Sequence, residues 1–273
     1  MKLGIVGSTT MADFWRAAAM AADARADIKY YESDVPGADL AIADCEVVWI
    51  PASSMAVNHG AGRVLYNPAA DPEHKITNGS PSFPLRHRSE IRHLKQVLEG
   101  GKLGQVGTVR LSLCRSASAP GPLCYSEFSP VAGALQQLGG HGFDAIHWCF
   151  GNIERVHAVE SSESTNAAQY ALLVARLDSG AIAHLELSFA EPAGGDYLYY
   201  EIAAKNGIVE YDSRKEPTLE LVAKTSAAPA TSPPPELVAE LRAFLRNETA
   251  NFPTHADAAA ASQLVKASRA SVI

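Results

Sequence analysis

The chain has 273 residues, which is long for one hydrophobic core and comfortable for two, so we expect two domains. Apolar residues make up 47% of the sequence and charged residues 19%, a balance that favours folded domains over extensive disorder. The net charge of −7 and the lack of a basic stripe argue against nucleic acid as a partner.

Cysteine and histidine spacing bears on compartment and metal binding. The four cysteines are scattered without CxxC pairing, as in cytosolic proteins with reduced thiols. The nine histidines form no HxxxH or HExxH pair, so we expect no bound metal. The sequence begins with a strand pattern rather than a signal peptide, and no segment is apolar enough to span a membrane. We therefore expect a cytoplasmic protein without a membrane partner.

Short apolar runs alternate with helical patterns in the first part of the chain. A helical pattern over 10–24 follows the first strand, and 53–58 can form one or two helical turns. This alternation predicts a parallel sheet, because parallel strands are joined through right-handed helical crossovers. Residues 69–84, rich in Pro, Gly, Ser and Asn, are expected to form a loop or hinge. The predicted strands are 2–6, 28–32, 45–50 and 63–66.

The second half of the chain predicts a different sheet. Its β-rich runs follow one another with turn signals such as Asp178-Ser179-Gly180 and Lys205-Asn206-Gly207, which indicate antiparallel pairing. The predicted strands are 106–114, 157–160, 170–177, 182–189, 197–204 and 207–211, and the predicted helices are 89–99, 131–150, 236–247 and 256–270.

The predicted fold class is therefore α/β. We expect a truncated Rossmann-like parallel-sheet domain over 1–85, followed over 86–273 by an α+β domain with a large open, mainly antiparallel sheet. The C-terminal helices can pack back on the first domain. An open sheet with helices on one face leaves the other face to be covered, and a second copy of the chain is the usual cover. We therefore expect a homodimer or larger assembly.

From residue 86 onward the sequence carries an ordered set of short motifs. They are Arg86 with Lys95 and the run 98–107, the segment from Gly133 through His141 to Asp144, the hairpins at 179–183 and 202–207, and the tail from Pro235. In order and spacing these motifs resemble the Gfo/Idh/MocA family, the group of glucose-fructose oxidoreductase and inositol dehydrogenase. The resemblance implies a nicotinamide cofactor and a small-molecule substrate of the sugar or polyol class.

A dinucleotide site needs a glycine-rich turn where backbone amides reach the pyrophosphate. Here the turn reads Gly7-Ser8-Thr9-Thr10-Met11-Ala12, and Thr9 stands where a second glycine is expected. Its β-branched side chain crowds the approach to the phosphates. We therefore expect NAD to bind weakly or not at all, with residues 7–11 as its phosphate contacts.

Two strand ends complete the predicted cofactor site. Glu32 ends the second strand, where an acidic residue binds the adenine ribose hydroxyls and repels a 2′-phosphate. The alternative interpretation of Glu32 is a solvated strand end. Pro51, which ends the third strand, is the remaining candidate cofactor contact.

The resemblance also implies catalytic positions. The family's Glu-Lys-Pro strand end corresponds to Tyr66-Asn67-Pro68, and its helical Asp and His, four residues apart, correspond to Gln137 and His141. Asn67 can form hydrogen bonds but cannot supply the charge or proton of a lysine, and Gln137 is neutral. His141 keeps a ring that can accept the proton of a substrate hydroxyl. The alternative is that His141 is a packed or solvated helix residue.

Two further residues are candidate substrate contacts. Arg86 can bind an anionic group of the substrate, and Tyr125 can line the pocket from a loop.

The sequence leaves two functions open. One is an oxidoreductase that transfers hydride between a nicotinamide and a sugar, polyol or related carbonyl compound. The other is a non-redox protein on the same scaffold, either a ligand-binding or partner subunit or an enzyme of another reaction class. The family resemblance and the strand-turn-helix at the start of the chain favour the first function as the general class. The departures at Thr9, Asn67 and Gln137 favour the second.

Overall fold

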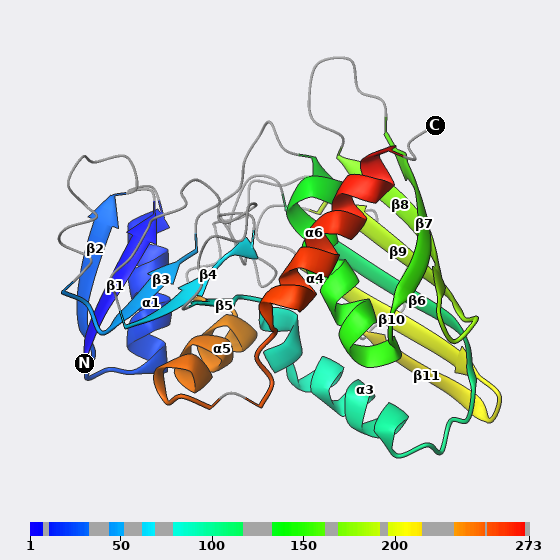
Figure 1. Ribbon diagram of the computed structural model, residues 1–273, viewed down its shortest axis with the longest axis horizontal. Helices are drawn as coiled ribbons and strands as arrows, with labels where there is room; N and C mark the ends of the chain where they lie inside the picture. The colour runs from blue at the N-terminus through cyan, green and yellow to red at the C-terminus, as the bar shows by residue number, and fades with distance from the viewer. Residues whose placement is uncertain are drawn as a thin grey trace. The chain divides into compact units, whose positions relative to one another are not determined.

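The chain folds into two compact units (Figure 1). The first contains residues of Met1–Arg88 and Thr231–Ser262, and the second contains residues of Ser89–Cys124, Phe128–Ala230 and Gln263–Ile273. The computed structural model describes residues 1–7, 11–32, 44–51, 62–68, 79–116, 133–161, 169–191, 196–214, 232–248 and 250–270.

A five-stranded sheet forms the centre of the first unit, in the order β2-β1-β3-β4-β5. Every neighbouring pair in it is parallel, which confirms the predicted parallel sheet. Because the strands are parallel, their carboxyl ends lie along one edge. The strands are β1 (Lys2–Gly7), β2 (Asp27–Glu32), β3 (Val47–Ile50), β4 (Arg63–Tyr66) and β5 (Gly79–Pro81).

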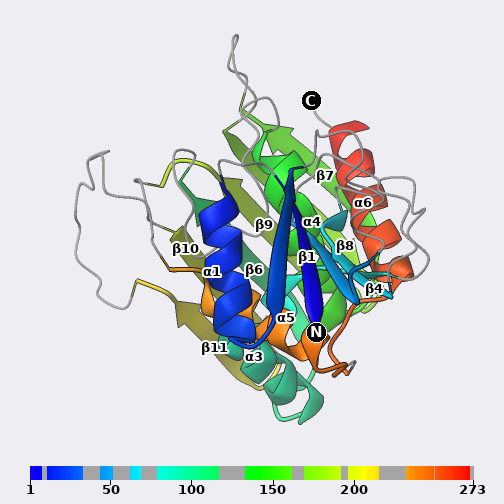
Figure 2. The same ribbon diagram turned by 90° about the vertical axis from the view of Figure 1, so that its left-hand side faces the viewer.

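Helices α1 (Ala12–Ala22) and α5 (Pro235–Leu245) cover one face of this sheet (Figure 2). Trp15 of α1 meets Trp49 of β3 edge to face, with ring centroids 5.3 Å apart. Arg242 of α5 donates to the carbonyl of Ala21, 2.7 Å away, so the two helices are joined at the end of α1. The other face of the sheet carries a second buried cluster, composed of Val6, Cys45, Val48, Ile50, Val64 and Tyr66.

The structure differs from the sequence prediction in the segment expected as a loop over 69–84. Its last part forms the short strand β5, which pairs with β4, and Pro84 begins the 3₁₀ turn Pro84–His87. Proline is tolerated here because Pro81 lies on an edge strand. The helical turns predicted at 53–58 lie outside the described residues.

A six-stranded sheet forms the second unit, in the order β11-β10-β6-β9-β8-β7. Its neighbours are antiparallel except β6 and β9, so the mainly antiparallel sheet is confirmed with one parallel pair. β9 can run parallel to β6 because a helix and a hairpin separate them in the chain. The strands are β6 (Val106–Arg115), β7 (Ile153–Glu160), β8 (Tyr170–Leu177), β9 (Ile182–Ser188), β10 (Asp196–Ala204) and β11 (Gly207–Asp212).

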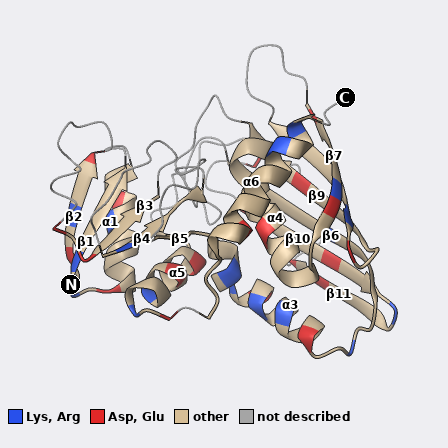
Figure 3. Ribbon diagram, viewed as in Figure 1, with Lys and Arg blue, Asp and Glu red and all other residues tan. Residues whose placement is uncertain are grey.

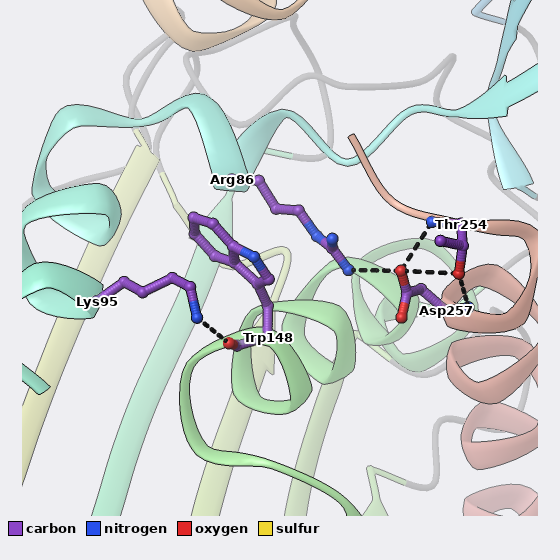
Figure 4. A network of polar contacts seen from close by, with 5 residues as sticks. All are labelled: Arg86, Lys95, Trp148, Thr254 and Asp257. Atoms are coloured by element: carbon purple, nitrogen blue, oxygen red, sulfur yellow. Dashed lines mark hydrogen bonds and ion pairs between the residues drawn. The ribbon is translucent and has the colours of Figure 1, made fainter. Parts of the chain in front are cut away.

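Helix α4 (Ala134–Phe150) packs on one face of this sheet, and α3 (Ser89–Glu99) lies beside it (Figure 1). Gly142 allows a close approach to β9, because a Cβ there would lie 2.7 Å from Cδ2 of Leu185. Lys95 of α3 donates to the carbonyl of Trp148, 2.8 Å away, and its ammonium lies 4.9 Å from the indole centroid (Figure 4). Helix α6 (His255–Ala270) has its last residues in this unit.

The opposite face of the second sheet carries exposed apolar side chains. Burial alternates strictly along β8, where Leu172 is 51% exposed and Val174 is 40% exposed. Val159 of β7, 58% exposed, pairs with Leu172. Figure 3 shows charges of both signs on the elements of each unit rather than a single basic stripe on the described residues. No helix among the described residues is long and apolar enough to cross a membrane.

Candidate functional site

The carboxyl edge of the first sheet brings four of the predicted site residues to one side of the first unit. Gly7 ends β1 and is in register with Glu32, which ends β2. Pro51 follows β3, and Asn67 follows β4. In open parallel sheets, ligands bind outside this edge, so these residues occupy the position expected of a nucleotide site.

The described parts of the phosphate turn fit a dinucleotide. Gly7 is buried, Glu32 is exposed, and Met11 precedes α1 with no side-chain hydrogen bond capping the helix. The first amides of a helix attract a phosphate, and an exposed carboxylate one strand away suits ribose hydroxyls. Ser8, Thr9 and Thr10 lie outside the described residues, so the effect of Thr9 stays a prediction.

Asn67 is held firmly at this edge. It is 5% exposed, and its backbone N–H donates to the carbonyl of Ile50, 2.8 Å away. Its side-chain Nδ2 donates to the carbonyl of Pro51 at 3.3 Å, which joins the ends of β3 and β4. The side chain is therefore oriented, but an amide does not exchange protons with a substrate.

Arg86 lies in the 3₁₀ turn of the first unit and is 4% exposed. Its guanidinium is 3.3 Å from Oδ2 of Asp257 (Figure 4). Asp257 also accepts from the backbone N–H of Thr254 at 2.7 Å, while its own N–H donates to Oγ1 of Thr254 at 3.2 Å. This reciprocal pair is a capping box at the start of α6. Arg86 therefore has a structural partner, and its predicted contact with a substrate anion stays a prediction.

His141 and Gln137 lie on α4 in the second unit. They are four residues apart, so their side chains share one face of the helix, as the sequence predicts. His141 is 6% exposed, whereas Gln137 is half-buried. Burial, and then the positive charge of Arg115, lower the pKa of His141 from 6.5 to about 4. The imidazole is therefore neutral at neutral pH and can accept a proton.

Arg115 is a candidate functional residue that the sequence analysis missed. It ends β6 and is 2% exposed, and its guanidinium carbon lies 5.9 Å from the ring centroid of Phe189. The available signal was the period of two along β6: Leu111 and Leu113 are buried on the side of α4, and Arg115 is the next residue on that side.

Two further residues named from the sequence are Asp144 and Tyr125. Asp144, one turn beyond His141 on α4, is 1% exposed. Tyr125, the candidate pocket residue, lies outside the described residues. Among the residues that are described, no group of three His, Cys, Asp or Glu side chains could hold a metal ion.

Comparison with known families and sequences gives one match. Residues 91–210 match the family described as the GFO/IDH/MocA C-terminal domain. A search of curated protein sequences finds no match.

Solved structures share the fold over nearly the whole chain. GenD2 from gentamicin A biosynthesis, in complex with NAD, is 19% identical with a TM-score of 0.71, over 99% of this chain and 93% of that chain. Scyllo-inositol dehydrogenase from Lactobacillus casei, with NAD(H) and scyllo-inositol, is 19% identical with a TM-score of 0.71, over 100% and 96%. An oxidoreductase from Agrobacterium radiobacter, with NAD+, L-tartaric acid and magnesium, is 16% identical with a TM-score of 0.66, over 99% and 96%. At these identities the likeness establishes the fold.

Proposed function

Because residues 91–210 match the GFO/IDH/MocA C-terminal domain, we propose that this chain is an NAD-dependent oxidoreductase acting on a sugar, polyol or related carbonyl compound. The observation that carries the proposal is His141, a buried imidazole that is neutral at neutral pH and lies on α4 at the family's acid/base position. The complexes of GenD2 with NAD and of scyllo-inositol dehydrogenase with NAD(H) and scyllo-inositol support this class of reaction.

The first unit supplies the residues that would hold NAD. Gly7 and the start of α1 would bind the pyrophosphate, and Glu32 would bind the adenine ribose. Pro51 and Asn67 would contact the nicotinamide end, with Asn67 oriented by its hydrogen bond to the Pro51 carbonyl. When bound, the nicotinamide supplies the acceptor for a hydride.

The second unit supplies the proton chemistry. In the oxidation direction a secondary alcohol loses a hydride from carbon and a proton from oxygen, which leaves a carbonyl. His141 takes the hydroxyl proton, and in the reverse reaction it returns that proton to the carbonyl oxygen. Gln137 lies on the same helix face and would orient the substrate by hydrogen bonding.

A second function rests on a specific observation. Asn67 and Gln137 are neutral amides where the family has a lysine and an aspartate, and the Asn67 side chain donates to the carbonyl of Pro51, the residue after β3. Each amide can bind a sugar by hydrogen bonds without taking part in hydride transfer. The alternative is therefore a ligand-binding or partner subunit, or an enzyme of another reaction class.

NADH fluorescence separates the two functions. The protein would be incubated with NAD+ and a panel of sugars, polyols and their acids, and with NADH and the corresponding carbonyl compounds. The oxidoreductase proposal predicts NADH formation or consumption with at least one member of the panel. Binding of a panel member without any change in NADH, in either direction, would contradict it and support the alternative.

A further inference from the structure

On strand β6, the apolar side chains that face α4 are followed by a charged side chain at the end of the strand. Along β6, Val109, Leu111 and Leu113 are buried on the face that α4 covers. Arg115 is the next residue on that face, and it is only 2% exposed. Burying a guanidinium is costly unless anionic groups face it, and the carboxylate of a ligand can be one of those groups.

The neighbouring strands define what surrounds Arg115. Asp196 of β10 is in register with Arg115. The ring centroid of Phe189, which follows β9, lies 5.9 Å from the guanidinium carbon of Arg115. Glu191 donates its backbone N–H to the carbonyl of Arg115, while its carboxylate engages Arg214. A guanidinium has five N–H donors in a planar fork, so it can serve a protein carboxylate and a ligand anion together.

Helix α4 places His141 at the same end of the sheet. A Cβ on Gly142 would touch Leu185, which pairs with Leu111, and a Cβ on Gly139 would lie 3.8 Å from Cδ1 of Leu187. The helix therefore runs toward Arg115 as it approaches its N-terminus. Helical side chains tilt toward the N-terminus of their helix, so the His141 side chain tilts toward the end of β6 where Arg115 lies.

We propose that Arg115 binds an anionic group of the substrate beside the hydroxyl whose proton His141 accepts, so that the substrate is a sugar acid, polyol acid or hydroxy acid rather than a neutral sugar. This inference rests on the proposed function, because it deepens the same site. A carboxylate matches the guanidinium fork through two parallel hydrogen bonds. Burial first, and then the positive charge of Arg115, hold the pKa of His141 low. A bound carboxylate offsets the second of these causes, which makes the imidazole a better proton acceptor when the substrate is bound.

Calorimetric titration without cofactor tests the inference independently of hydride transfer. The ligands would be two matched pairs, D-glucuronate with D-glucose and D-gluconate with D-glucitol. The proteins would be wild type, Arg115→Gln and Arg115→Lys. Arg110→Gln is the matched control, because Arg110 lies on β6 but on the outer face, with a side chain 59% exposed and paired with Glu201.

The inference predicts that at least one acid binds wild type about 10-fold or more tightly than its neutral partner, the scale of a charge-assisted pair. Arg115→Gln should abolish this preference, Arg115→Lys should keep part of it, and Arg110→Gln should leave it unchanged. If Arg115→Gln does not fold, wild type and Arg115→Lys still decide the outcome. Equal affinity for acid and neutral partners in wild type, or no binding of either acid, would overturn the inference. Acid-selective binding without NADH turnover would instead count against the proposed function alone.

Discussion

His141 combines burial with a ring that remains neutral at neutral pH. Substitution His141→Asn keeps a hydrogen-bonding side chain, although a smaller one, but removes the proton acceptor. We expect turnover to fall roughly 100-fold or more, the usual scale for loss of a general acid/base. Steady-state kinetics on the substrate found in the panel would measure it.

The control for this substitution must separate chemistry from folding. The melting temperature of His141→Asn should match wild type, because a buried helix residue can also lose activity by unfolding. Gln137→Asp and Asn67→Lys should be less harmful, since neither amide transfers a proton. Full activity of a folded His141→Asn protein would show that other residues carry the reaction.

The low pKa of His141 also predicts how stability depends on pH. Its folded pKa of about 4 lies below the ordinary value of 6.5, so the unfolded chain binds more protons between these values. Stability contributed by the neutral imidazole is therefore fully present above pH 6.5 and is lost as the pH falls toward 4. The loss should be roughly 2 to 4 kcal/mol. Urea titrations across this range should show a smaller loss in His141→Gln.

At the scale of elements, the start of α6 depends on Asp257. This carboxylate joins the capping box with Thr254 to the ion pair with Arg86, whose side chain is 5% exposed. Asp257→Ala leaves a buried guanidinium without this partner, so we expect a loss of about 2 to 4 kcal/mol in unfolding free energy. Urea denaturation would measure the change.

The matched control is an exposed ion pair on a neighbouring segment of the same unit. Arg246 and Glu248 lie 4.0 Å apart with side chains 65% and 60% exposed. Glu248→Ala should change stability by less than about 0.5 kcal/mol, because solvent screens such pairs. Similar, small effects of both substitutions would contradict the structural importance assigned to Asp257.

Strands with a clear pattern of apolar residues could be predicted from the sequence. Features that depend on pairing with a neighbouring strand could not. The run Val47–Ile50 and the alternation along Tyr170–Leu177 have the composition of buried and half-buried strands, and both are strands. The short strand β5 was missed because Gly79-Ser80-Pro81 has no strand signal and is ordered by pairing with β4. The parallel pairing of β6 with β9 depends on the path of the chain between them rather than on either strand's residues.

The candidate site shows the same division. Gly7, Glu32, Pro51 and Asn67 could be placed at one edge because each directly follows or ends an apolar run in a parallel sheet. Arg115 could not be recognised, because a charged residue at the end of a strand is usually solvated. Only the position of α4 over β6 and β9 shows that this side chain is buried.

At the scale of the whole molecule, the exposed face of the second sheet predicts assembly. Val159, Leu172 and Val174 are adjacent in the pairing of β7 with β8 and are all largely exposed. We expect a second copy of the chain to cover this face, giving a homodimer or larger assembly. Light scattering should therefore report at least about twice the 29.0 kDa of one chain at micromolar concentration.

Substitution on this face should dissociate the assembly. Leu172→Lys places a charge in the centre of the apolar patch and should yield monomers. Met20→Lys is the matched control, because Met20 is a similarly exposed apolar residue, at 59%, but lies on α1 in the first unit. A wild-type protein that scatters light only as a monomer would rule out this assembly.

The most direct test of the account is calorimetric titration of the wild-type protein with NAD+ and NADP+. The carboxyl edge of the first sheet should bind NAD+, but Thr9 in the phosphate turn should keep the dissociation constant above roughly 10 μM, equivalent to about −7 kcal/mol. NADP+ should bind more weakly than NAD+, because Glu32 would face its 2′-phosphate. The substitution Glu32→Gln should therefore reduce the difference in affinity between NAD+ and NADP+. A dissociation constant for NAD+ below roughly 10 μM would show that Thr9 does not weaken binding in the phosphate turn. No binding of either nucleotide at millimolar concentration would contradict the proposal of an NAD-dependent oxidoreductase.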